Sequence, residues 1–265
     1  MLRKQMRIFR ASLAIILVIT LALAMPACSA TTPINTAVVQ AAVAPLVKNI
    51  LTSLNNNEYM GFARDFNRTM KNTINQTAFS KLYSLMQREV GDYQSDLFFS
   101  AAKKGSAVTV VYFAQYSKEP AGVSVTLTMQ LVSGAYEVQG LVFDSLNLRG
   151  KPIDVSGVRA YSDSETENIL ESCNNNDYSG FSKDFNPTMK NATSPTKFGQ
   201  LYSQMTSTVG EYQAKEFEIV STSSNIITVE YYTQYTLEPA GVWVSISFDS
   251  NQKVAGLYFN SPKLQ

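Results

Sequence analysis

The stretch Asp65-Phe-Asn-Arg-Thr-Met-Lys-Asn72 recurs as Asp184-Phe-Asn-Pro-Thr-Met-Lys-Asn191. The correspondence continues at an offset of 119 residues, without a gap, between residues 57–129 and residues 176–248. Each copy is long enough to form a domain of ordinary size. We therefore interpret the 265-residue chain as a tandem duplication and consider the two copies together.

The composition excludes several kinds of active site. The chain contains no histidine, which removes Ser-His-Asp and Cys-His nucleophile systems, histidine general bases and histidine metal sites. It also lacks a P-loop, a Gly-x-Gly-x-x-Gly fingerprint, a Cys-x-x-Cys pair and the spacing of a calcium loop. No catalytic residue, metal site or cofactor is predicted from these motifs.

The charge balance argues against nucleic-acid binding. The formal net charge is +1, but Arg3, Lys4, Arg7 and Arg10 all precede the first acidic residue, Glu58. Beyond residue 27 the chain carries 18 basic and 21 acidic residues, a net charge of −3. Because no basic cluster remains there, we expect no nucleic-acid partner.

Residues 1–27 have the order of an export signal. A basic segment is followed by an apolar run over residues 11–25 and then by small residues. The run is shorter than the ~20 residues that a membrane-spanning helix needs. A cleaved signal and an uncleaved N-terminal anchor both fit, and both place the remaining chain outside the cytoplasm.

The Ala27-Cys28 pair resembles the lipobox of bacterial lipoproteins, which implies lipidation of Cys28. Met25 and Pro26 depart from the usual residues of that motif. Residues 28–44 then predict a tether between the membrane and the first domain. We expect a location in the cell envelope, with the membrane as a partner of the N-terminus. If Cys28 carries no lipid, a disulfide with Cys173 is an alternative to a buried free thiol.

The periodicity within each copy changes from helical to extended. Apolar residues at helical spacing predict a first helix near 45–54 and 165–173, a second around Tyr59 and Tyr178, and a third from 76 and 195 onward. Ser194-Pro195 fits a helix N-cap followed by Pro at N1. Alternation from 108 and 227 onward predicts strands, and Glu119-Pro-Ala-Gly122 fits a turn.

These patterns predict an α+β fold with two tandem domains, each of three helices followed by a curved antiparallel sheet of about four strands. The expected division is residues 1–27 as signal or anchor, 28–44 as tether, 45–146 and 165–265 as domains, and 147–164 as linker.

The opening motif has two interpretations. Pro187 replaces Arg68, so this position needs no backbone donor and fits a helix start. Asp65 and Asp184 precede it, and we expect them to cap the following turn. The alternative is a catalytic carboxylate.

Several of these segments resemble the DUF3887 family, a domain of unknown function. The resemblance rests on Asn-Asn-[Glu/Asp]-Tyr-x-Gly-Phe, the opening motif, a Phe-x-x-Leu-Tyr helix, Val-Gly-[Asp/Glu]-Tyr and a closing Gly-Leu-[Val/Tyr]-Phe. It covers residues 46–145 and 165–261 and implies an NTF2-like or cystatin-like fold. The family has no established catalytic residues to carry over.

A fold similar to the NTF2-like cone implies a pocket between helices and sheet, the usual place for a small ligand. Repeated tyrosines then become candidate ligand-binding residues, with plain core packing as the alternative. They are Tyr59, Tyr83, Tyr112, Tyr116, Tyr178, Tyr202, Tyr231 and Tyr235.

Three functions remain open at this stage. The first is non-catalytic binding of a small apolar ligand or an envelope protein by the two domains. The second is an isomerase- or dehydratase-type enzyme that uses a Tyr/carboxylate pair in the cone pocket. The third is a structural spacer of the cell envelope. An inward carboxylate beside a Tyr distinguishes the second from the other two.

Overall fold

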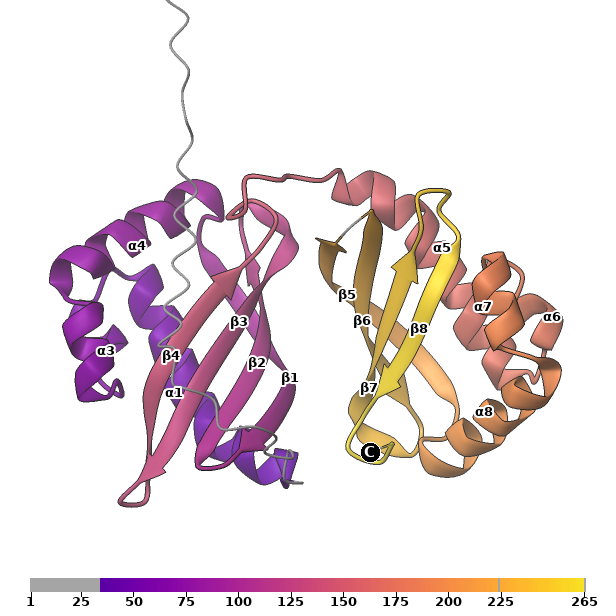
Figure 1. The fold of residues 1–265 in the computed structure, drawn as a ribbon, viewed down its shortest axis with the longest axis horizontal. Coiled ribbons are helices and arrows are strands. Elements are labelled where there is room, and N and C mark those ends of the chain that lie inside the picture. The colour runs from indigo at the N-terminus through magenta and orange to yellow at the C-terminus, as the bar shows by residue number, and fades with distance from the viewer. Residues whose placement is uncertain (1–33, 224, 265) are drawn as a thin grey trace, which may run out of the picture.

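The computed structural model describes residues 34–223 and 225–264, which form two units of the same element order (Figure 1). The expected export signal, Cys28 and the start of the expected tether lie outside the described residues. Unit 1 comprises α1 (Thr36–Asn55), α2 (Tyr59–Phe62), α3 (Arg68–Thr73), α4 (Gln76–Glu89), β1 (Tyr93–Lys104), β2 (Ala107–Tyr116), β3 (Glu119–Val132) and β4 (Ala135–Asp144). Unit 2 comprises α5 (Val155–Asn174), α6 (Tyr178–Phe181), α7 (Pro187–Ala192), α8 (Pro195–Thr208), β5 (Tyr212–Ser223), β6 (Ile226–Tyr235), β7 (Glu238–Phe248) and β8 (Val254–Asn260).

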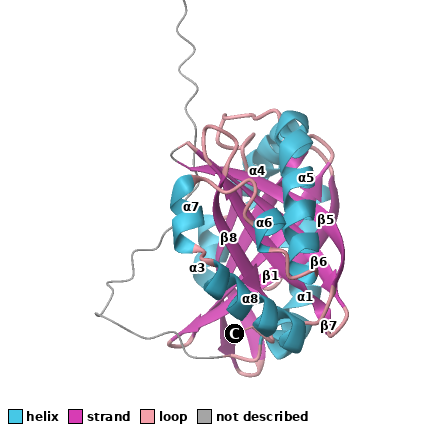
Figure 2. Cartoon of the chain, turned by 90° about the vertical axis from the view of Figure 1, so that its right-hand side faces the viewer, coloured by secondary structure: helices cyan, strands magenta, loops and turns pink. Residues whose placement is uncertain are grey.

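Each unit is an α+β layer structure, as the sequence predicts. The strands are antiparallel in the orders β1-β2-β3-β4 and β5-β6-β7-β8. The helices cover one face of each sheet and lie on the outer sides of the molecule, so that the helix-free faces look toward each other (Figures 1 and 2).

The cores form where the predicted stripes meet. Val47, Ile50, Leu51 and Leu54 of α1 are at most 2% exposed, and they join the inward residues of the sheet. In unit 2, Ile169 and Leu170 are fully buried, and Cys173 is buried as a free thiol. Burial raises the pKa of this thiol to about 11, so it acts as a small apolar residue.

The repeated motif forms a short additional helix in each unit. As predicted, Arg68 and Pro187 stand at its first position. The cap, however, is Asn67 or Asn186, whose side chain accepts the N–H of Met70 or Met189 at 2.8 Å. The expected capping role of the aspartates is therefore wrong, because the asparagine lies at the N-cap itself.

The same motif attaches the helices to the last strand. In unit 1, the Asn67 N–H donates to the Val138 carbonyl at 3.0 Å, and the Val138 N–H donates to the Asp65 carbonyl at 2.8 Å. Unit 2 repeats this arrangement with Val254. The motif is thus a structural joint between the two layers.

Two expected non-helical segments contain helix. Helix α1 begins at Thr36, within the expected tether, and Asn35 caps it by accepting the Val38 N–H at 3.1 Å. Helix α5 begins at Val155, within the expected linker, after an Asp154 cap. Pro45 lies inside α1, so it does not mark the helix start. The start of α1 was missed because Pro favours the first turn of a helix, and the start of α5 because its first turns carry few apolar residues.

The hairpin turns also differ from the prediction. Tyr116 already pairs with Glu119, so the turn is Ser117-Lys118 and the Glu-Pro-Ala-Gly stretch opens strand β3. Strands β1 and β5, which precede these hairpins, each span 12 residues.

Helix α1 is the one described helix that is long and apolar enough to cross a membrane by length and composition. Its apolar residues nevertheless pack in the core of unit 1. This packing is typical of the central helix of a folded domain.

Candidate functional site

The repeated tyrosines contribute to the cores of the two units. Four are at most 7% exposed, namely Tyr112, Tyr116, Tyr231 and Tyr235. The other four are half-buried, namely Tyr59, Tyr83, Tyr178 and Tyr202. None of the eight lines the three pockets found in residues 34–223 and 225–264. Their ligand-binding role stays a prediction.

The hydroxyls of the buried tyrosines differ between the units. Tyr231 donates to Asp163 at 2.7 Å and lies 2.9 Å from the Ser162 hydroxyl. In unit 1 the hydroxyls of Tyr112 and Tyr116 have no hydrogen-bond partner among the described residues. Burial raises the pKa of all three, so these phenols stay protonated and are unsuited to act as bases.

A Tyr-centred ion pair occurs in both units with its charges exchanged. In unit 1, Lys48 of α1 lies 3.6 Å from Asp96 of β1 and donates to the Tyr93 hydroxyl at 2.8 Å. In unit 2 the helix supplies the carboxylate, Glu167, and the strand supplies Lys215. Tyr212 donates to Glu167 at 2.9 Å. The exchange of charges preserves the attraction between the two side chains. This indicates that the ion pair holds α1 to β1 in unit 1 and α5 to β5 in unit 2.

Four carboxylates at equivalent positions of the two units are engaged in turns or ion pairs, among them Asp65 and Asp184, the candidates for catalysis. Glu119 accepts the Asn147 N–H at 2.8 Å, and Glu238 accepts the Lys263 N–H at 3.3 Å, so each ties a hairpin to the segment after the last strand. Asp65 pairs with Arg64, and Asp184 with Lys253. In these positions they act as structural acceptors.

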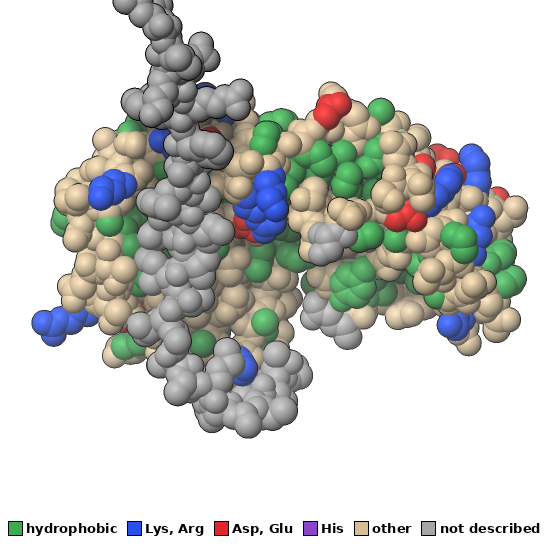
Figure 3. Space-filling view, turned by 45° about the horizontal axis from the view of Figure 1, so that its top comes forward, with side chains coloured by type: hydrophobic (Ala, Val, Ile, Leu, Met, Phe, Trp, Pro, Cys, Tyr) green, Lys and Arg blue, Asp and Glu red, His purple; other side chains and the backbone are tan. Residues whose placement is uncertain are grey.

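Aromatic side chains connect the helix-free faces of the two sheets. Trp243 of unit 2 meets Phe99 and Phe113 of unit 1 edge to face, with ring centroids 5.1 and 5.3 Å apart. Phe113, Ile219 and Trp243 are at most 7% exposed and form a core of their own. In the space-filling view, hydrophobic side chains gather where the units meet (Figure 3).

Residues of unit 1 also approach the backbone of unit 2 closely at this interface. The Gln115 side chain donates to the Glu218 carbonyl at 2.6 Å. Gly122 has a φ of +80°, and a Cβ there would lie 2.7 Å from the same carbonyl oxygen. Only glycine allows both this conformation and this approach.

A cleft of about 1000 Å³ opens beside this aromatic core. We call it the open cleft. Strands β1 and β2 of unit 1 form one wall, and β5 and the start of α5 form the other. Its lining includes Leu97, Phe113, Ile153, Ser156, Ala160 and Phe217, together with polar and charged residues. This volume suits a small organic ligand.

The open cleft is acidic. Five carboxylates line it, against the single cation Arg159; they are Asp96, Asp154, Asp163, Glu216 and Glu218. Asp96 and Asp163 pair with Lys48 and Arg159, and Asp154 caps α5. Among the described residues, no cation pairs with Glu216 or Glu218.

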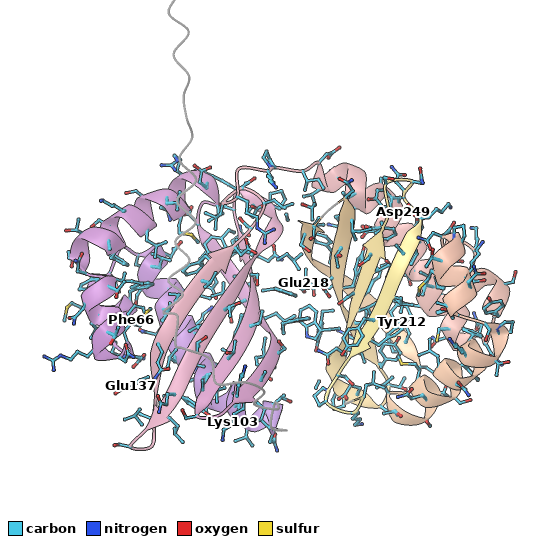
Figure 4. The ribbon with its side chains drawn as sticks, in the orientation of Figure 1. Phe66, Lys103, Glu137, Tyr212, Glu218 and Asp249 are labelled. Carbon is cyan, nitrogen blue, oxygen red and sulfur yellow. The ribbon has the colours of Figure 1, made fainter. Side chains whose placement is uncertain are left out.

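Glu218 lies between the two sheets, on the side of unit 2 that faces unit 1 (Figure 4). It is only 6% exposed, and its pKa is raised to about 7, first by burial and then by the like charge of Glu216. It falls at a register shift of β5 between Phe217 and Ile219. Such a bulge turns a side chain away from the regular alternation.

Part of the chain matches a known protein family. Residues 166–257 match DUF3887. The family is described as a protein of unknown function, and the matched DUF3887 region covers most of unit 2. No curated protein matches the chain. The DUF3887 match supports the resemblance seen in the sequence, and it contains both Glu218 and Trp243.

The sequence reasoning missed the residues of the open cleft. A register shift leaves no periodic signal, so Phe99 and Glu218 could not be placed at the interface. One signal was available, since Trp243 replaces Ser124 at the 119-residue offset. In the structure Trp243 lies at the contact between the units, where its side chain is buried against unit 1.

Proposed function

We propose that the protein is an exported, membrane-tethered binding protein that takes a small ligand without catalysis. In this proposal its two units are NTF2-like copies of one DUF3887 domain, and the open cleft between them is the binding site. The observation that carries the proposal is the cleft of about 1000 Å³, which has apolar side chains and uncompensated charge on its walls.

A binding screen tests this proposal on the full-length chain in a mild detergent. A chemically diverse set of small molecules is titrated by calorimetry, with detergent alone as the blank. Ser156 is exposed and lines the cleft, so Ser156→Trp should obstruct part of it. Ser203 is exposed on α8, so Ser203→Trp is the matched control.

The proposal predicts ligands whose affinity falls at least tenfold in Ser156→Trp and stays within twofold in Ser203→Trp. If no ligand is found, or if Ser156→Trp binds every ligand as well as the wild type, the cleft is not a binding site. In that case the structural spacer becomes the better account.

A smaller groove favours a second candidate, binding of an apolar ligand by unit 2 alone. A pocket of about 280 Å³ lies between α7, α8 and β8, with Met189, Leu201, Leu257 and Phe259 in its lining. Met189 is half-buried, whereas Met70, its counterpart in unit 1, is 2% exposed. Met189→Trp should abolish binding there and leave the open cleft unaffected.

The enzyme alternative has two Tyr/carboxylate pairs at the open cleft. Asp96 lines the cleft and accepts the hydrogen bond of Tyr93; burial raises the pKa of this phenol, which makes it unsuited to act as a base. Asp163 lines the cleft and accepts the hydrogen bond of Tyr231. Tyr231 is only 1% exposed, so a substrate atom in the cleft cannot reach its hydroxyl. This burial is why we favour binding over catalysis.

A further inference from the structure

The interface between the units has two pseudo-equivalent sides. On each side the start of a long helix and an edge strand of one unit face the β-hairpin of the other. The open cleft is lined by Val155, Ser156 and Arg159 of α5. At the offset of 119 residues their counterparts, Thr36, Ala37 and Gln40 of α1, line a second pocket of only about 120 Å³.

Aromatic side chains explain why only one side is open. The small pocket contains Phe99 and Trp243. The residues at the corresponding positions of the other side are Glu218 and Ser124. Two large rings are thus replaced by a carboxylate and a hydroxyl. These sequence differences between the copies nearly close the small pocket and leave the open cleft as an acidic cavity.

One cation, the Arg159 side chain, is held on the wall of the open cleft by an aromatic ring and a carboxylate. The Arg159 guanidinium lies over the Phe217 ring, 4.6 Å from its centroid. It also donates to Asp163 at 3.0 Å. An aromatic face beside a carboxylate is a favourable environment for a planar cation. Arg159 is neutralised by this pair, so the remaining charge of the cleft is negative.

Glu218 is the group that lacks a counter-charge. Its side chain is more than nine-tenths buried and lines the cleft, next to Glu216. The nearby Gln115 amide, a neutral group, donates its hydrogen bond to the Glu218 backbone carbonyl. Burying a carboxylate without a cation is costly. A bound cation would offset that cost.

We propose that the open cleft binds an organic cation with an apolar body, a guanidinium or ammonium compound whose charge pairs with Glu218. This inference rests on the proposed function, because it requires the cleft to be a binding site. It adds two points to the proposed function: the ligand is an organic cation, and Glu218 selects for its positive charge.

The test compares three probes on the full-length chain at pH 8.5, where the Glu218 carboxylate is ionised. Benzylguanidine is the cation, benzylurea is its neutral planar analogue, and phenylacetate is the anion. Glu218→Gln removes the charge at nearly constant shape. Glu211→Gln is the matched control, because Glu211 is exposed and does not line the cleft.

We expect calorimetry to show benzylguanidine binding at least tenfold tighter than benzylurea, and no binding of phenylacetate. Glu218→Gln should weaken benzylguanidine binding at least tenfold, and Glu211→Gln should change it less than twofold. Thermal unfolding of both variants checks that they fold.

Equal affinity for benzylguanidine and benzylurea, or an unchanged affinity in Glu218→Gln, would overturn the inference while leaving the cleft as a binding site. Absence of binding by all three probes would also overturn it. The diverse screen and the Ser156→Trp variant then decide separately whether the cleft binds anything.

Discussion

At the scale of single residues, Glu230 shows how the structure changes the meaning of a side chain. A carboxylate in an alternating strand normally lies on the solvent-exposed face, but the face of β6 that carries Glu230 turns toward unit 1. Glu230 is mostly buried and accepts a hydrogen bond from Ser245 at 2.5 Å. Burial raises its pKa to about 7. Its counterpart in unit 1 is Val111.

Glu230→Gln should stabilise the protein above pH 7. A carboxyl whose folded pKa is raised binds its proton more tightly in the folded state, so stability falls as pH rises from the unfolded value of 4.5 toward about 7. The substitution removes this loss, on the order of 3 kcal/mol at about 1.4 kcal/mol per pKa unit. Urea unfolding at pH 5 and pH 8 measures it. A larger gain at pH 5 than at pH 8 would contradict the burial of Glu230.

The cap of the motif gives a second residue-scale prediction. Asn186 accepts the Met189 N–H, whereas Asp184 meets Lys253 at the surface. Asn186→Ala should cost about 1 kcal/mol, since an N-cap is lost. Asp184→Ala should cost less, because exposed ion pairs contribute little. Denaturant unfolding of the two variants ranks them, and the reverse order would restore the aspartate as the cap.

At the scale of elements, most of the fold is predictable from the sequence. The stripe on α1 and the Ser194-Pro195 start of α8 depend on local periodicity and backbone chemistry, and both are confirmed. The start of α1 was missed because Pro45 indicates a later helix start, and the start of α5 because its first turns carry few apolar residues. Nor was the attachment of the motif to the last strand predictable, since it depends on backbone hydrogen bonds between distant segments.

The exchanged ion pair predicts a rescue between elements. Lys215→Asp alone should destabilise unit 2, because it places two carboxylates together beside Tyr212. Adding Glu167→Lys recreates the arrangement of unit 1 and should recover at least half of the loss. A double-mutant cycle by denaturant unfolding measures the coupling. Additive losses would show that the pair does not hold helix to strand.

At the scale of the whole molecule, the packing of the units could not be read from the sequence. It depends on a bulge residue and on glycine at one close approach, neither of which has a periodic signature. For the same reason the predicted site was placed inside each unit, whereas the open cleft lies between the two units.

Gly122→Ala tests this interface directly. The new methyl group would meet the Glu218 carbonyl oxygen at 2.7 Å, in addition to the cost of a φ of +80°. Gly134→Ala is the matched control, with a φ of +88° and no atom within 4 Å of the added Cβ. We expect Gly122→Ala to lose about 1–3 kcal/mol more than the control. Equal losses in thermal unfolding would mean that the units do not touch there.

Hydrogen–deuterium exchange of the full-length chain, with and without a saturating ligand from either titration, tests most directly whether the ligand binds between the units. The account predicts slower exchange in residues 155–160 at the start of α5 and in residues 216–219 of β5. Slower exchange confined to the groove of unit 2, around residues 189–205 and 257–259, or confined to the interior of either unit, would contradict it.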